Sequence, residues 1–177
     1  MINETIQRPP AELVAGFRSL LAHDSITCAL SDCMGRFNAM TSDMKPLFEG
    51  IRFVGTAVID GACRDVEEIR KLRFPVFSKG IVPNVGAIAG YGQVNVPIQC
   101  AGVAVSPGDM VVADGNGVVV VPLAEAADIL AKARQLLETE HLVQKKLKAG
   151  ATIGELVDID SIFASTFSYQ NKASKHD

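Results

Sequence analysis

The sequence predicts a mixed α/β domain, because strand-like segments alternate along the chain with segments of helical spacing. An apolar, β-branched run at residues 53–59 indicates a buried strand. After a short loop, Val66, Ile69 and Leu72 lie at helical spacing, and a second strand-like run follows at residues 73–80. Two valine-rich runs further on flank an Asp-Gly-Asn-Gly turn, which is a strong hairpin signal. With 177 residues, 48% of them hydrophobic, the chain can bury one substantial core.

Two helices are expected before this strand–helix–strand unit. Residues 9–22 carry apolar side chains at helical spacing, with Pro10 in the first turn, where proline is tolerated. Residues 25–32 predict a second, shorter helix that ends before Gly35. The segment 38–49 is expected to be a loop.

The second half of the chain is expected to end in a long helix. The glycine-rich residues 81–93 predict a loop, and residues 94–105 alternate β-formers with small side chains. Residues 123–149 form an amphipathic pattern that Gly150 closes as a C-cap. We therefore predict a single domain over residues 1–177, whose C-terminal helical extension comprises residues 122–177.

Composition limits the classes of function. A net charge of −3 leaves no basic footprint for nucleic acid, and no apolar run approaches the length of a membrane span. The four cysteines form no CxxC pair, so they are expected to be small buried hydrophobes in a reducing compartment. A cytoplasmic location without nucleic-acid or membrane partners follows as the expectation.

Arg64 and Asp65 are the strongest candidate site residues, because they lie between a strand and a helix, just after an expected Asp60-Gly61 turn. In a structural interpretation, Asp65 caps the helix with Glu68 as its capping-box partner, and Arg64 is merely exposed. In a functional interpretation, Arg64 grips a substrate carboxylate and Asp65 supplies a hard oxygen to Mg²⁺ or Mn²⁺.

Other candidates are weaker. Asp109 and Asp114 could be metal ligands, but turn chemistry explains both more simply. Cys63, beside an arginine, could be a nucleophile, yet a buried structural thiol is the simpler interpretation. The three histidines are scattered along the chain and suggest neither a zinc site nor a catalytic triad.

Three runs of sequence indicate a resemblance to a known protein family. VIDGACRDVEEI, FPVFSKG and VNVPIQCAGVAVSPGDMVVADGNGVVVVP closely resemble the RraA-like family, over about residues 26–150. That family includes the class II 4-hydroxy-4-methyl-2-oxoglutarate aldolases and the protein regulator of ribonuclease E activity. The resemblance implies a swivelling β/β/α domain, in which helices flank a compact mixed sheet core and a long helix lies at the C-terminus. It also implies a homotrimer or hexamer with sites between subunits.

The resemblance further implies a reaction. A divalent-metal-dependent lyase of this kind cleaves 4-hydroxy-4-methyl-2-oxoglutarate to pyruvate, and decarboxylates oxaloacetate through the same pyruvate enolate. Arg64 matches the catalytic, substrate-binding arginine, and Asp65 the catalytic aspartate that holds the metal, Mg²⁺ or Mn²⁺. Glu140 falls where aldolase-like members carry a glutamate that reaches a neighbouring subunit's site, although an exposed helix charge is an equally good interpretation.

The sequence departs from the family at one point. An apparent internal deletion between Val58 and Ile59 removes a strand, a helix and a substrate-binding loop that family members carry there. The loss predicts exposed apolar side chains and an unpaired sheet edge. It also leaves open an alternative function, a non-catalytic oligomeric regulator that binds a ribonuclease E-type partner. A methyltransferase is a third possibility, but the chain has no cofactor-binding glycine motif to support it.

Overall fold

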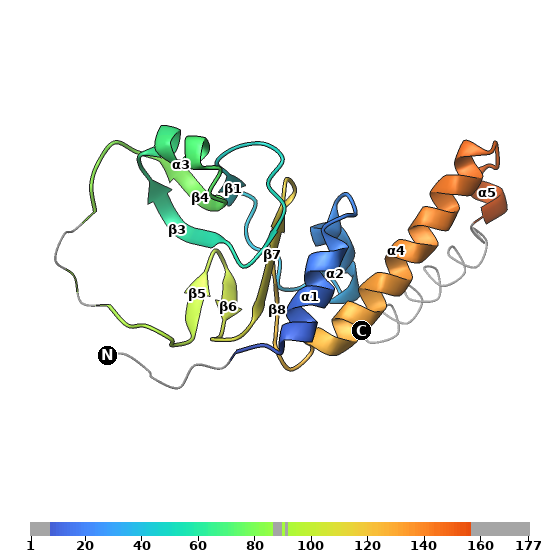
Figure 1. Ribbon diagram of the computed structural model, residues 1–177, viewed down its shortest axis with the longest axis horizontal. Coiled ribbons are helices and arrows are strands. Elements are labelled where there is room, and N and C mark those ends of the chain that lie inside the picture. Colours follow the sequence, from blue (N-terminus) through green and yellow to red (C-terminus); the bar gives the residue numbers. More distant parts are fainter. Residues whose placement is uncertain (1–7, 87–89, 91, 157–177) are drawn as a thin grey trace, which may run out of the picture. The chain divides into compact units, whose positions relative to one another are not determined.

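The protein is described by a computed structural model that covers residues 8–86, 90 and 92–156 (Figure 1). The chain divides into two compact units, Met1–Leu136 and Leu137–Asp177, and every named strand lies in the first. Helices and small sheets alternate in this first unit, which confirms the expected α/β class.

The predicted strand–helix–strand unit is present. Strand β3 (Ala57–Cys63), helix α3 (Val66–Leu72) and strand β4 (Val76–Ile81) follow one another, and the two strands pair in parallel. Strand β1 (Lys45–Pro46) pairs antiparallel with β4, giving the order β1-β4-β3. The prediction that residues 38–49 are only a loop was therefore wrong at β1. A strand of two residues leaves no periodic signal in the sequence.

The strand predicted at residues 53–59 is two strands in two sheets. Strand β2 (Phe53–Val54) ends at Gly55, whose φ of +78° turns the chain before β3 begins. Strand β2 pairs antiparallel with β7 (Met110–Asp114), which in turn forms the expected hairpin with β8 (Gly117–Val121). A second hairpin, which the sequence did not reveal, joins β5 (Ile98–Cys100) to β6 (Val103–Val105).

Asp60 and Gly61 do not form the predicted turn. Both lie inside β3, where the pairing with β4 becomes irregular: Ile59 is opposite Ser78, whereas Ala62 is opposite Gly80. Two residues of β3 therefore face one residue of β4, which is the pattern of a β-bulge.

Strand β3 runs unbroken across the Val58–Ile59 junction, where the resemblance implies an internal deletion. In the sheet order it is the terminal strand, and the Ile59 side chain is 39% exposed. Further exposed aliphatic side chains lie at the end of β4 and in the loop after it, namely Ile81, Val82 and Val85. This surface has the apolar character that the sequence predicts for the junction.

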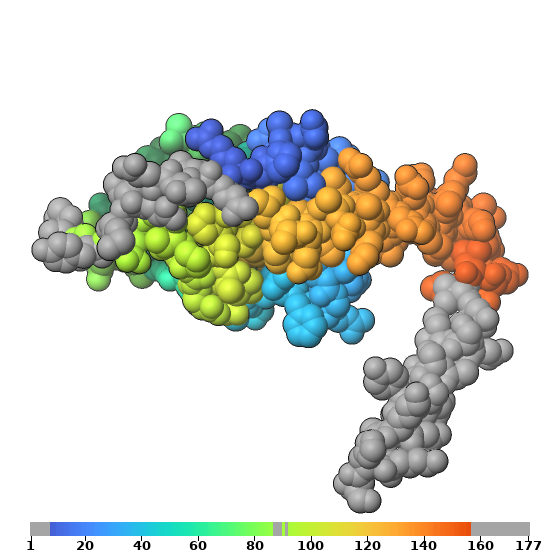
Figure 2. Space-filling view, turned by 90° about the horizontal axis from the view of Figure 1, so that it is seen from below, coloured from blue at the N-terminus to red at the C-terminus, as the bar shows by residue number. Residues whose placement is uncertain are grey.

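Helix α1 (Ala11–Leu20) and helix α2 (Ile26–Cys33) form as predicted. Gly16 allows a close approach between α1 and α4 (Ala126–Lys148), because a Cβ atom at this position would overlap the Leu130 side chain. Figure 2 shows the blue atoms of α1 directly against the first yellow-orange turns of α4. No helix in the described part of the chain is both long and apolar enough to cross a membrane.

The long helix ends where the sequence predicts. Gly150 follows it with a φ of +100°, and the Ala151 N–H group donates to the Lys146 carbonyl oxygen at 3.1 Å. In the second unit, α5 (Ile153–Leu156) begins with a capping contact, in which the Thr152 N–H group donates to Glu155 Oε2 at 2.8 Å.

The core of the first unit includes two clusters of buried side chains. The first comprises Met44, Ile51, Phe77, Ala101, Ala113 and Val118, and the second Leu47, Cys63, Val66 and Val76. Because β4 supplies Phe77 to one cluster and Val76 to the other, this strand joins the two parts of the core.

The cysteines were predicted only in part. Cys63 and Cys100 are buried as expected, whereas Cys33 is half-buried and Cys28 is exposed. The prediction for Cys28 was wrong because this residue lies on the outer side of α2, whose buried face is formed by Ile26, Thr27, Ala29 and Leu30.

Asp114 connects the β7–β8 hairpin to α2. Its buried carboxylate accepts hydrogen bonds from the Thr27 N–H group at 3.1 Å, the Thr27 hydroxyl at 2.8 Å and the Asn116 N–H group at 2.7 Å. It therefore satisfies an N–H group in the first turn of a helix that lacks a local side-chain cap.

Replacing Asp114 by alanine is expected to lower the free energy of unfolding by about 1–3 kcal/mol, because buried donors lose their acceptor. Asp114→Asn keeps one acceptor oxygen and should cost less. Urea unfolding at a constant m-value measures both changes. Equal stability of the alanine variant and the parent protein would show that water replaces the lost acceptor.

Candidate active site

Arg64 and Asp65 form the two-residue link between β3 and α3. Asp65 has a left-handed backbone conformation, with φ of +57°, and its side chain makes no capping hydrogen bond. A capping side chain normally requires an extended backbone, which directs its oxygen at the first N–H groups of the helix. The capping-box interpretation of Asp65 and Glu68 was therefore wrong.

The Asp65 carboxylate pairs with its neighbour instead. Arg64 Nε lies 3.3 Å from Asp65 Oδ2, and the two side chains are 47% and 66% exposed. No other ion pair or hydrogen bond of the Arg64 guanidinium occurs within the described residues, so its two terminal nitrogens are open to a ligand. Because exposed ion pairs contribute only about 0–1 kcal/mol, Arg64 can exchange this partner for a substrate carboxylate at little cost.

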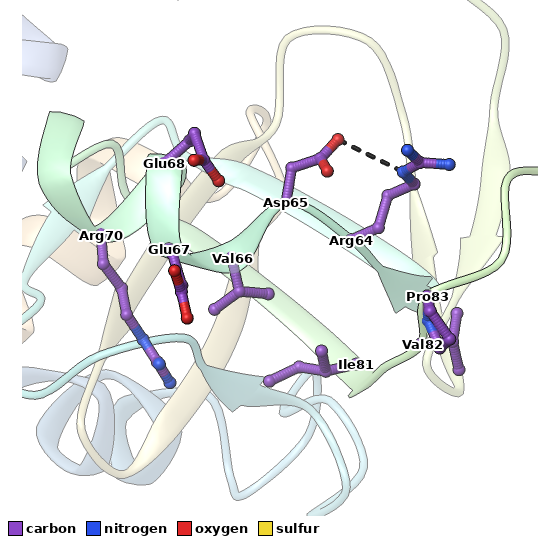
Figure 3. Close-up of a pocket in the computed structure, with 9 residues that line it drawn as sticks. All are labelled: Arg64, Asp65, Val66, Glu67, Glu68, Arg70, Ile81, Val82 and Pro83. Atoms are coloured by element: carbon purple, nitrogen blue, oxygen red, sulfur yellow. Dashed lines mark hydrogen bonds and ion pairs between the residues drawn. The ribbon is translucent and has the colours of Figure 1, made fainter.

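Both side chains line a cleft of about 540 Å³. Its lining is Arg64, Asp65, Val66, Glu67, Glu68, Arg70, Ile81, Val82 and Pro83. Figure 3 shows Arg64 and Asp65 extending from the strand–helix link on the side away from Val66, which is buried in the core. The cleft lining thus combines charged side chains from the β3–α3 link and from α3 with aliphatic side chains from the end of β4 and the residues after it.

The donors of this cleft fit only a loosely held metal ion. Within the described residues there is no group of three or more His, Cys, Asp or Glu side chains that could enclose a metal. Mg²⁺ commonly needs no such cage, because it keeps several waters and binds through one or two carboxylates and the substrate. The exposed Asp65 carboxylate, with Glu67 and Glu68 on the same cleft, meets that smaller requirement.

The other candidate residues have different roles. Asp109 and Asp114 accept backbone hydrogen bonds in turns, from Ser106 at 2.8 Å and from Asn116 at 2.7 Å, so turn chemistry explains them as expected. The buried Cys63 thiol donates to the Arg64 carbonyl oxygen at 3.7 Å, which fits a structural thiol.

Glu140 lies exposed on α4, in the second compact unit. Its contribution to a neighbouring subunit's site stays a prediction.

The sequence did not reveal a closed ring of polar contacts around Asp60, in the strand that leads to the site. We call it the Asp60 ring. Lys79 Nζ lies 2.6 Å from Asp60 Oδ1 and 3.8 Å from Asp43 Oδ2. The Thr41 hydroxyl donates to Asp43, and the Thr41 N–H group donates to the Ala101 carbonyl oxygen at 3.0 Å. The Ala101 N–H group closes the ring by donating to Asp60 Oδ2 at 2.8 Å. The one signal in the sequence was the pair of charges, Asp60 and Lys79, within otherwise apolar strands.

The contacts of the Asp60 ring shift the pKa values of its charged members. The Lys79 ammonium and the Ala101 N–H group lower the pKa of Asp60, and the Thr41 hydroxyl is the main cause of the lowered pKa of Asp43. The Asp60 carboxylate in turn raises the pKa of Lys79. Every charged member is thus stabilised in its ionised form.

These shifts predict a stability plateau. The carboxylates stabilise the fold fully above the ordinary Asp pKa of 3.8, and this contribution is lost as the pH falls through their lowered pKa values. Lys79 contributes fully below the ordinary Lys pKa of 10.5, and its contribution is lost as the pH rises through its raised pKa. Urea midpoints across this range should fall at both ends, and less steeply for Lys79→Met than for the parent. Urea midpoints that change with pH in the same way for the two proteins would show that the Asp60 ring does not stabilise the fold.

Comparison with known proteins finds a family match over part of the chain. Residues 54–120 match the RraA-like family, described as Aldolase/RraA. An uncharacterized protein of Methanocaldococcus jannaschii is 38% identical over 110 residues, which cover 62% of this chain and 53% of that protein. A putative 4-hydroxy-4-methyl-2-oxoglutarate aldolase of Halalkalibacterium halodurans is 41% identical over 78 residues, which cover 44% of this chain and 37% of the relative. The match thus spans about half of the first relative and little more than a third of the second.

The fold of the chain is similar to that of a solved structure. The crystal structure of Streptomyces coelicolor RraAS2, an unusual member of the RNase ES inhibitor RraA protein family, matches with a TM-score of 0.65 at 22% identity. The match covers 78% of this chain and 100% of that one. Residues 54–120 are therefore RraA-like in sequence, and the chain has a fold similar to that of the Streptomyces coelicolor protein.

Proposed function

We propose that the protein is a divalent-metal-dependent carbon–carbon lyase. Its substrates would be 2-oxo acids of the 4-hydroxy-4-methyl-2-oxoglutarate type, cleaved by a retro-aldol reaction to pyruvate, with oxaloacetate decarboxylated at the same site. The observation that carries the proposal is the Arg64–Asp65 pair, exposed at one cleft within the RraA-like segment. The name of the Halalkalibacterium halodurans relative supports the same reaction.

Arg64 would bind the carboxylate beside the 2-oxo group. Its open terminal nitrogens can form the two parallel hydrogen bonds of an arginine–carboxylate fork. Holding the carboxylate fixes the orientation of the 2-oxo group and of the bond that breaks. In the aldol substrate the C4 hydroxyl loses its proton, the C3–C4 bond breaks, C4 becomes a carbonyl and C3 gains a proton. In oxaloacetate the C3–C4 bond breaks with loss of carbon dioxide, and C3 again gains a proton.

Asp65 would hold the metal, Mg²⁺ or Mn²⁺, directly or through water. A divalent ion at this position supplies Lewis-acid polarisation of the 2-oxo group and stabilises negative charge on its oxygen. When substrate takes Arg64, Asp65 loses its cationic partner, and its carboxylate becomes available as a hard oxygen ligand. Substrate and metal binding are therefore expected to assist each other.

Pyruvate release tests this proposal. The purified protein is mixed with Mg²⁺ or Mn²⁺ and either 4-hydroxy-4-methyl-2-oxoglutarate or oxaloacetate, and pyruvate is followed with a coupled dehydrogenase. We expect turnover above the metal-only background, loss of turnover with a chelator, and recovery when the metal is returned. Rates equal to the metal-only background with both substrates would refute a lyase.

An assembly with shared sites extends the proposal to Glu140. In a homotrimer or hexamer, Glu140 of one subunit would act in the site of the next. Arg64→Gln and Glu140→Gln proteins, each with strongly reduced activity by itself, should then regain activity when they are denatured and refolded together, since some mixed sites carry both native residues. A Glu140→Gln protein as active as the parent would show that Glu140 does not act in the site.

A second candidate is a non-catalytic oligomeric regulator that binds a ribonuclease E-type partner. The deletion that the resemblance implies at the Val58–Ile59 junction favours it, because the resemblance places part of the substrate pocket in the missing segment. Binding of a purified ribonuclease E-type protein, without lyase turnover, would establish this function. Turnover without such binding would exclude it.

A further inference from the structure

We propose that Asp60 and Lys79 are positioning residues, which hold the bulge in β3 and thereby set the direction of Arg64 and Asp65. The catalytic consequence rests on the proposed function, whereas the effect on strand register does not.

The bulge lies directly before the site. Strand β3 pairs regularly with β4 up to Ile59 and Ser78, and again from Ala62 and Gly80. Asp60 and Gly61 together therefore face Lys79 alone. Bulges are rare in parallel strand pairs, so a specific interaction is needed to account for this one.

The bulge decides where Arg64 lies. Without it, the register before the bulge would continue, and Cys63 would be opposite Val82; the observed partner of Cys63 is Ile81. A register shift of one residue moves a side chain about 3.3 Å along the partner strand and to the other face of the sheet. The cleft that contains Arg64 and Asp65 consequently exists only in the bulged register.

The side chain of Asp60 is the contact that can hold the bulge. It pairs at 2.6 Å with Lys79, the residue that faces the bulge, and accepts the Ala101 N–H group at 2.8 Å. Gly61 provides no competing explanation: its φ lies outside the left-handed region, and a Cβ atom there would meet no other atom within 4 Å. The backbone would accept other residues at position 61, so the ionic contact remains as the specific cause.

The rest of the Asp60 ring fixes both partners in place. Asp43 is a second carboxylate for Lys79, at 3.8 Å, and Thr41 binds both Asp43 and the Ala101 carbonyl oxygen. Ala101 is buried in the core and has a left-handed backbone, with φ of +46°. The turn between β5 and β6 thus presents the N–H group of its buried residue Ala101 to Asp60, which links the bulge to the core.

Four variants test the proposal by NMR and by kinetics. Lys79→Met removes the cation, Lys79→Arg keeps it, and Asp60→Asn removes the opposing charge. Lys45→Met is the matched control, because Lys45 belongs to the same sheet, is exposed, and pairs through its backbone with Ser78. A through-hydrogen-bond coupling between the Val82 amide nitrogen and the Cys63 carbonyl carbon reports the native register, because the Val82 N–H group donates to that carbonyl oxygen at 3.0 Å. Hydrogen exchange of the Ala101 amide reports the contact with Asp60.

We expect Lys79→Met and Asp60→Asn to lose the coupling between Val82 and the Cys63 carbonyl group, and to lose protection of the Ala101 amide. Lyase kcat/KM should fall about a hundredfold, the loss that a displacement of order 1 Å can cause. Lys79→Arg should restore register and activity, and Lys45→Met should change neither. Combining Lys79→Met with Asp60→Asn should add little further loss.

The outcomes separate the two proposals. A native register in both Lys79→Met and Asp60→Asn overturns the inference, whatever the activity. A shifted register in a protein whose parent form is inactive upholds the positioning role and refutes the lyase. Failure of Lys79→Arg to restore the register also overturns the inference, since a cation at this position would not be what holds the bulge.

Discussion

Replacing Arg64 by glutamine is expected to lower kcat/KM for pyruvate formation about a hundredfold. The substitution leaves an uncharged amide that can still donate to the substrate carboxylate, so the loss corresponds to about one charge-assisted hydrogen bond, which contributes about 1.5–3 kcal/mol. Because Arg64 is exposed and pairs only with Asp65 in the described structure, the variant should fold as the parent does. Initial rates at varied substrate, with the melting temperature as a control for folding, give the result.

Two further variants make this test specific. Arg64→Lys keeps the charge but loses the planar fork, so it should recover only part of the activity. Lys71→Gln removes one positive charge from the adjacent helix α3 at a position that does not line the cleft, and should leave the kinetics unchanged. An Arg64→Gln protein as active as Lys71→Gln would show that Arg64 does not bind substrate.

Replacing Phe77 by alanine is expected to lower the free energy of unfolding by about 3–5 kcal/mol. The Phe77 side chain is 0% exposed and belongs to the cluster that joins β4 to the turn between β5 and β6. Its loss leaves a cavity that the surrounding strands cannot fill, because interiors are closely packed. Urea or thermal unfolding measures the change.

Phe74 provides the matched control. It lies three residues earlier, and its side chain is 54% exposed, so Phe74→Ala should change stability by less than about 1 kcal/mol. Similar losses for the two variants would mean that the cluster around Phe77 does not form the core. A large loss for Phe74 alone would instead point to burial of Phe74 between subunits.

The sequence predicts those structural elements that depend on residues close to one another in the chain. The β3–α3–β4 unit and the β7–β8 hairpin follow from local periodicity and turn chemistry, and both are present. The strand at residues 53–59 was predicted as one piece, because its apolar run continues through Gly55; only the pairing partners divide it between two sheets. Sheet membership is a long-range property that periodicity does not carry.

The same distinction applies to the site. Arg64 and Asp65 are adjacent in the sequence, so their place between a strand and a helix could be predicted. The capping-box interpretation of Asp65 was wrong because the sequence does not reveal its left-handed backbone. The contact between Asp60 and the Ala101 N–H group spans 41 positions of the chain, and no local pattern indicates it.

A crystal soaked with Mn²⁺ and pyruvate tests the central claim most directly. The anomalous signal of manganese locates the metal, and the difference density locates the pyruvate carboxylate. We predict manganese at the Asp65 carboxylate or at a water bound to it, and the pyruvate carboxylate on the terminal nitrogens of Arg64. Manganese and pyruvate bound elsewhere, with the Arg64–Asp65 ion pair intact, would contradict the proposed site.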